Sequence, residues 1–162
     1  MQVDEAIVCV NPMRANDLVA EAIDTGVVQE LRGYPELRRE VRHGDSRIDM
    51  LLSRGDERCL VEVKSVTMDV GGRVSAFPDS VTDRGTRHLR ELMSVVAQGD
   101  RAVIFFACNR SDVQRMRPAD EIDPTYGQTL REAAAAGVEV IAYRGEISPK
   151  GMWLRTRIPV EL

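Results

Sequence analysis

The sequence predicts a single α/β domain whose mixed central sheet is flanked by helices. Three strand-like segments follow one another at 37–43, 46–53 and 58–66. Further on, RAVIFFAC at 101–108 is an almost continuous apolar run, typical of a central strand that is covered on both faces. Helical periodicity flanks these strands. Because 162 residues fit one ordinary domain, we expect residues 1–162 to form a single unit.

The remaining elements complete the order α-β-β-β-α-β-α-β, after a short strand expected at 5–10. Asn16 is expected to cap a first helix that runs to residue 31. A second helix is expected over 82–98, with Gly99 past its end, and a third over 124–136, ended by Gly137. Strands are expected at 138–143 and, as an edge strand, within 152–162. This order is typical of a mixed sheet with helices on its faces.

Composition excludes several classes of protein. A formal charge of −4 argues against indiscriminate nucleic-acid binding. No apolar run approaches the ~20 residues that span a membrane, and the acidic N-terminus MQVDEAIVCV is no signal peptide, so a cytoplasmic protein is expected. Cys9, Cys59 and Cys108 are far apart and apolar in context, which predicts buried thiols and no zinc site.

The three middle strands permit a geometric argument. If Gly44–Asp45 is a two-residue hairpin turn, Glu40 faces Asp49. If 54–57 is a four-residue loop, Asp49 faces Glu62. Alternation then places apolar side chains on one face of the sheet and charged ones on the other. The apolar face comprises Val41, Ile48, Met50, Leu52, Cys59, Val61 and Val63, and the charged face Glu40, Asp49, Glu62 and Lys64.

Three adjacent carboxylates on one sheet face repel one another. A hard divalent cation with oxygen ligands is the simplest compensation, and Lys64 adds a positive charge beside it. Lysine is a notable choice here, because the 22 basic residues comprise two lysines, Lys64 and Lys150, and 20 arginines. The alternative is a solvated polar face with a simple Lys–Glu pair.

Asp49, a hairpin spacer and Glu62-Val63-Lys64 form the PD-(D/E)xK arrangement of metal-dependent nucleases. More specifically, the chain resembles the C-terminal domain of the bacterial sugar fermentation stimulation protein A family. The resemblance covers nearly the whole chain. Its segments are LVAEA at 18–22, SRIDMLL at 46–52, CLVEVKSVT at 59–67, FPD at 77–79, T-x-RG-x-x-HLREL at 82–92, NRSD at 109–112 and RPADEIDP at 117–124.

The resemblance implies an αβββαβ restriction-endonuclease-like core and a Mg²⁺- or Mn²⁺-dependent nuclease acting on DNA or RNA. Asp49, Glu62 and Lys64 would be catalytic, with Asp49 and Glu62 holding the ion. Glu40, or Glu21 on the first helix, would add a further metal ligand; a plain solvent-facing role is the alternative for Glu21. The family usually carries an OB-like domain ahead of this one. We expect it to be absent here, so that a partner chain is one possible source of that module.

Nucleic acid would be bound by basic side chains around this site. Arg38, Arg42 and Arg47 are expected to form a basic rim. Arg84, Arg87 and His88 are expected on the exposed face of the 82–98 helix, where His88 either touches phosphate or is plain polar surface. Two other functions remain open: a non-catalytic DNA-binding or regulatory module linked to sugar metabolism, and a protein–protein scaffold. The sequence does not specify the oligomeric state.

Overall fold

A mixed sheet forms the centre of the protein, as expected. The computed structural model describes residues 2–3, 6–7 and 14–162, and the side chains of 14–162. Within these ranges the sheet has six strands: β3 (Glu36–His43), β4 (Ser46–Arg54), β5 (Glu57–Val66), β7 (Arg101–Cys108), β9 (Glu139–Ser148) and β10 (Gly151–Ile158). Their order is β10-β9-β7-β5-β4-β3, with β5, β7 and β9 parallel and the outer pairs antiparallel. The central place of β7 and the edge position of β10 confirm the predictions for both segments.

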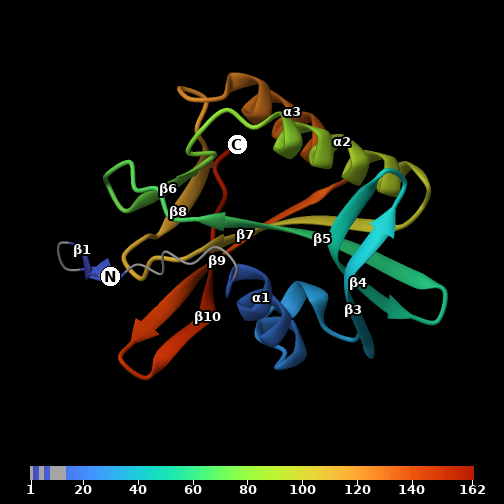
Figure 1. The fold of residues 1–162 in the computed structure, drawn as a ribbon, viewed down its shortest axis with the longest axis horizontal. Helices are drawn as coiled ribbons and strands as arrows, with labels where there is room; N and C mark the ends of the chain where they lie inside the picture. Colours follow the sequence, from blue (N-terminus) through green and yellow to red (C-terminus); the bar gives the residue numbers. More distant parts are fainter. Residues whose placement is uncertain (1, 4–5, 8–13) are drawn as a thin grey trace.

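Helices cover both faces of this sheet (Figure 1). The helix α1 (Arg14–Asp24) and the short 3-10 helix η1 (Gln29–Leu31) lie on one face, and α2 (Asp83–Ala97) and α3 (Pro124–Ala135) lie on the other. Helices α2 and α3 begin at side-chain caps. Thr82 accepts a hydrogen bond from the Gly85 amide at the start of α2, and Asp123 accepts one from the Tyr126 amide at the start of α3. No helix in the described part of the chain is long and apolar enough to cross a membrane.

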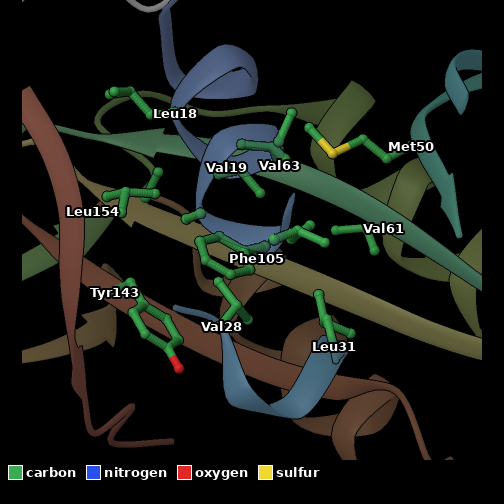
Figure 2. Packing of buried hydrophobic residues seen from close by; sticks show 14 of the residues in the cluster. Leu18, Val19, Val28, Leu31, Met50, Val61, Val63, Phe105, Tyr143 and Leu154 are labelled. Atoms are coloured by element: carbon green, nitrogen blue, oxygen red, sulfur yellow. The ribbon is translucent and has the colours of Figure 1, made fainter. Parts of the chain in front are cut away.

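The two faces of the sheet carry separate hydrophobic cores. On the α1 side, Phe105 of β7 lies among Val61, Val19 and Val28 (Figure 2). On the other side, Ile104 and its alternating neighbours on β7 pack with apolar residues of α2 and α3. This double coverage explains why the sequence of β7 is apolar at almost every position.

The start and end of the first helix differ from the prediction. Asn16 lies inside α1 and is no cap, because the helix begins at Arg14. The helix ends at Asp24, well before residue 31. Gly26 has a φ of +75°, and the amides of Gly26 and Val27 bond back to the carbonyls of Ile23 and Ala22, which closes the helix. Of the strand expected at 5–10, the structure describes only β2 (Ala6–Ile7), which pairs with β1 (Gln2–Val3).

The β3–β4–β5 register is close to the predicted one. His43 pairs with Ser46 across the Gly44–Asp45 turn, and Met50 pairs with Val61. Arg54 pairs with Glu57, so the second loop has two residues rather than four.

The predicted alternation of the sheet faces fails at one point. Val41 and Ile48 pack into the core beneath α2, while the other five residues of the predicted apolar set lie in the α1-side core. Glu40 and Asp49 are not paired, although the ladder positions on either side of them, Arg39–Met50 and Val41–Ile48, are. Glu40 has a φ of +53°. This left-handed residue interrupts the pleat, so the residues before and after it face opposite sides.

Two smaller features complete the fold. The parallel strands β6 (Val74–Phe77) and β8 (Arg115–Pro118) form a small second sheet that the sequence did not predict. Cys59 and Cys108 are buried free thiols, as expected, and burial raises the pKa of each to about 12. Cys9 lies outside the described residues.

Candidate functional site

Asp49 lies where β4 and β5 separate. Their ladder of paired residues ends at Met50–Val61, one position before the expected Asp49–Glu62 pair. Instead, the carboxylate of Asp49 accepts a hydrogen bond from the Val63 amide, at 2.8 Å from Oδ2, and one from Asn16 Nδ2, at 2.9 Å from Oδ1. Burial and the charge of Glu62 raise the pKa of Asp49 above 3.8, although these hydrogen bonds oppose the rise. The predicted cross-strand pair of Asp49 and Glu62 is therefore absent, and the Asp49 carboxylate instead binds the backbone next to Glu62, at Val63.

Glu62 is buried, with 4% of its side chain exposed, and its two carboxylate oxygens differ. Oε1 accepts from Lys64 Nζ at 2.9 Å and from His88 Nδ1. Oε2 is buried and has no hydrogen-bond partner among the described residues. Burial raises the pKa of Glu62, but the donors His88 and Lys64 outweigh it, so the pKa lies below 4.5. Glu62 is thus ionised at neutral pH with one oxygen unused.

Lys64 is the single lysine of this cluster and lies close to both acids. Its side chain is 13% exposed, and Nζ lies 3.4 Å from His88 Nδ1 as well as 2.9 Å from Glu62 Oε1. Its positive charge acts to lower the pKa of both Asp49 and Glu62. Two carboxyl groups therefore share the charge of one lysine.

His88 corrects the prediction for the second helix. It was expected on the exposed face of α2, in contact with phosphate or as polar surface, but only 5% of its side chain is exposed and it faces Glu62. The buried face of α2 includes Leu89, Leu92 and Val95, and His88 lies one turn before Leu92 on that same face. The helix therefore contributes a residue to the acidic cluster.

The oxygen atoms of this cluster fit a hard divalent cation. Asp49 and Glu62 both offer carboxylate oxygens. Glu62 Oε2 is buried and receives no hydrogen bond from the described residues, and burying such an oxygen costs free energy unless a positive partner is present. Among the described residues, no three His, Cys, Asp or Glu side chains are grouped as a complete set of metal ligands. Mg²⁺ usually keeps several waters and is held by one or two carboxylates, so Asp49 and Glu62 match that smaller requirement.

The two additional acidic ligands suggested by the sequence point elsewhere. Glu40 is exposed, and its Oε2 lies 3.5 Å from Arg47 Nη1. Glu21 is exposed on α1 and lines a pocket with Trp153 and Arg155 of β10. The residue of α1 that reaches the cluster is Asn16. Neither glutamate therefore joins Asp49 and Glu62 in this structure.

The five predicted arginines are all exposed: Arg38, Arg42, Arg47, Arg84 and Arg87. Arg42 and Arg47 are paired directly across the β3–β4 ladder, an arrangement of like charges that destabilises a sheet unless an anion offsets it. Asn109 and Arg110, at the end of β7, are buried instead. Asn109 donates to Ser65 Oγ, and Arg110 pairs with Asp69 and Asp112.

Asn16 and Tyr126, both near the cluster, escaped the sequence analysis. Asn16 resembled a helix cap, and its long-range bond to Asp49 has no local signal. Tyr126 is fully buried on α3 with a hydroxyl that has no partner among the described residues; burial and the charge of Glu62 raise its pKa. Glu91, one turn after His88, accepts from the Ser46 hydroxyl, and its Oε2 is a further buried oxygen without a described partner.

Comparison with known proteins yields consistent matches. The profile described as "Sugar fermentation stimulation protein RE domain" matches residues 13–151. The sugar fermentation stimulation protein homolog of Thioalkalivibrio sulfidiphilus is 50% identical over 164 residues, which covers 100% of this chain and 69% of that protein. The homolog of Teredinibacter turnerae is 55% identical over 155 residues, 94% of this chain and 66% of that protein.

A solved structure shares the fold. It is described as Pyrococcus furiosus SfsA in complex with Ca²⁺, and it superposes with a TM-score of 0.85 at 32% identity. The match covers 93% of this chain and 65% of that one. The chain therefore spans about two thirds of the length of the relatives it matches.

Proposed function

Because this chain belongs to the sugar fermentation stimulation protein (SfsA) family, we propose that its Asp49–Glu62–Lys64 site is a divalent-cation-dependent phosphodiesterase acting on DNA or RNA. The observation that carries the proposal is the unused, buried Glu62 Oε2 beside the carboxylate of Asp49. Mg²⁺ or Mn²⁺ is the expected ion, since both accept carboxylate oxygen. The relative from Pyrococcus furiosus, described in complex with Ca²⁺, supports a hard cation in this fold.

Each residue of the site has a distinct part in this chemistry. Asp49 and Glu62 Oε2 would hold the ion, and Asn16 and the Val63 amide fix the orientation of the Asp49 carboxylate. The ion, when bound, supplies an activated water and neutralises charge on the phosphate. Lys64 Nζ would position the attacking water or accept its proton, and donate to the phosphate oxygens that become more negative.

Exposed arginines would provide the nucleic-acid contacts. Arg42 and Arg47 are paired across β3–β4 and Glu40 offsets part of the charge of Arg47, so a phosphate beside Arg42 would add the second anion. The chain as a whole is acidic, at −4, and these local charges must therefore carry the binding. We expect weak binding by this chain alone and tighter binding with an OB-like partner. The binding constant should fall as salt rises, and each neutralised phosphate should add ~0.7–0.9 to the slope of its logarithm against the logarithm of the salt concentration.

The decisive experiment is incubation of the purified protein with end-labelled single- and double-stranded DNA and RNA. Reactions contain Mn²⁺, Mg²⁺ or EDTA, and Asp49→Asn is the matched control for contaminating nucleases. The proposal predicts cleavage of at least one substrate with a cation and none with EDTA or with Asp49→Asn. Binding without cleavage under every condition would favour the alternative, a non-catalytic DNA-binding or regulatory module linked to sugar metabolism.

A further inference from the structure

The Glu62 carboxylate is held from one side only. Both of its donors, Lys64 Nζ and His88 Nδ1, reach the same oxygen, Oε1, and the other oxygen has no partner in the described part of the chain. Two donors on one oxygen are more than orientation requires. Their different attachments to the fold suggest different roles.

His88 is the rigid donor of the two. It projects from α2 next to Leu89 and one turn before Leu92, which are both fully buried, and its imidazole is almost inaccessible to solvent. Lys64 reaches Glu62 along a flexible four-carbon chain and is more exposed. A donor on a packed helix fixes a carboxylate more firmly than a donor on a mobile side chain.

We propose that His88 is a positioning residue that donates Nδ1–H to Glu62 Oε1 and thereby directs Oε2 toward the cation, whereas Lys64 is a temporary partner. This inference rests on the function proposed above. With the Nδ1 proton directed to Glu62, His88 has no acceptor for Lys64 on that nitrogen, although the two atoms are 3.4 Å apart. Lys64 is therefore bound to the cluster through Glu62 Oε1.

Charge explains why the two partners separate when a cation binds. Before binding, Lys64 offsets part of the negative charge of Asp49 and Glu62. A divalent ion held by Asp49 and Glu62 would take over that task and would repel the nearby ammonium. The imidazole of His88 is held by the packed face of α2, so His88 keeps its bond to Glu62. Lys64 then becomes available to the attacking water and the phosphate.

The test measures Mn²⁺ dissociation constants by titration calorimetry. His88→Phe removes the donor but keeps an aromatic ring, and should weaken binding about 10- to 100-fold, the usual effect of losing a partner of a metal ligand. His88→Gln restores a donor and should recover most of the affinity. Lys64→Met should bind Mn²⁺ at least as tightly as the parent. His43→Phe is the matched control, because His43 is the only other histidine of the chain, and it should have no effect.

Two further measurements separate positioning from a general structural role. In nuclease assays His88→Phe should raise the Mn²⁺ concentration for half-maximal rate, while Lys64→Met should lower kcat and leave that concentration unchanged. Long-range ¹H–¹⁵N spectra of the cation-free parent, with only two histidines to assign, should show a proton on His88 Nδ1.

Each opposite result has its own meaning. Parent-like Mn²⁺ affinity in a folded His88→Phe overturns the role of His88. If His88→Phe does not fold, weak Mn²⁺ binding by a folded His88→Gln overturns it instead. An equal loss in Lys64→Met overturns the temporary role of Lys64. A parent that binds no Mn²⁺ overturns the proposed function and this inference together.

Discussion

Two clusters of charged side chains at different places on the sheet differ in how completely their carboxylate oxygens are paired. Around Arg101, at the start of β7, the guanidinium makes two hydrogen bonds to Glu139, one to the Tyr34 hydroxyl and one to the Glu30 carbonyl. One cation meets one carboxylate there, in a two-pronged pair. Around Lys64, one cation meets two carboxylates, and Glu62 Oε2 has no partner in the described chain.

The difference separates a complete cluster, Arg101 with Glu139, from an open cluster, Lys64 with Asp49 and Glu62, in which one oxygen is left for a further ligand. Arginine presents a rigid fork that matches both oxygens of a carboxylate, so the Arg101 pair is complete. Lysine donates from a single point and leaves an oxygen free. In a chain with 20 arginines, the acidic cluster has the residue that leaves room for another ligand. The following predictions test this contrast, from the largest effect to the smallest.

Exchanging the cation of the open cluster should have the largest effect. Lys64→Arg should fold and keep its response to metal, but lose cleavage by about 10²-fold or more if the lysine acts in acid–base chemistry. The guanidinium is bulkier and does not give up its proton. Lys64→Ala should behave similarly in the same labelled-substrate assay. Parent-like cleavage by Lys64→Arg would reduce Lys64 to simple charge compensation.

Metal should stabilise the open cluster measurably. Millimolar Mn²⁺ or Mg²⁺ should raise Tm, because a ligand at 100 times its Kd adds about 2.7 kcal/mol to the free energy of unfolding. Asp49→Asn and Glu62→Gln should both abolish this response in thermal melts. A response that persists in both variants would place the ion elsewhere.

Without metal, those two variants should differ from each other. The raised pKa of Asp49 means that its charge is unfavourable in the folded protein, so Asp49→Asn should be as stable as the parent or more so. The lowered pKa of Glu62 means the reverse, and Glu62→Gln should be less stable because Lys64 loses its partner. Urea unfolding in EDTA at pH 7 measures both.

The effect of Asp49 should depend on pH in a defined direction. A native pKa above 3.8 means that the folded state holds the proton more tightly, so stability contributed by this group falls as pH rises from 3.8 through the native pKa. The advantage of Asp49→Asn over the parent should therefore be present at pH 7 and shrink as pH falls toward 3.8. Urea curves across this range in EDTA would show the trend, and an advantage that grows in acid would contradict it.

Exchanging the cation of the complete cluster should have the smallest effect. Arg101→Lys loses the two-pronged pair with Glu139 and the bond to Tyr34, but the guanidinium is over a third exposed. We expect a loss of about 1 kcal/mol in the free energy of unfolding. Metal-induced stabilisation and cleavage should be unchanged. A loss of the metal response would mean that the two clusters are coupled.

Much of the fold could be predicted because local patterns determine it. The Gly44–Asp45 turn sets the β3–β4 register, and Met50 of β4 pairs with Val61 of β5 as predicted. The apolar run of β7 gave its central position. These features depend on turn chemistry and hydrophobic periodicity, which are visible in a single sequence.

The remaining features depend on contacts between distant segments. The left-handed φ of Glu40 reverses the facing of the chain, and no residue type signals it, since glutamate rarely adopts such a conformation. Asn16 reaches Asp49 from 33 positions away, and His88 reaches Glu62 from 26 positions away. Helical spacing alone could not decide that the α2 face bearing His88 was the buried one.

The hydrogen bond from the Val63 amide to Asp49 gives the site its own spectroscopic reporter. A main-chain N–H that would otherwise belong to the ladder is bound to a side chain that is expected to ligate the cation. The chemical shift of this amide proton responds to the charge of its acceptor. One backbone resonance can therefore follow ionisation of Asp49 and arrival of a cation, in the unmodified protein and without any substrate.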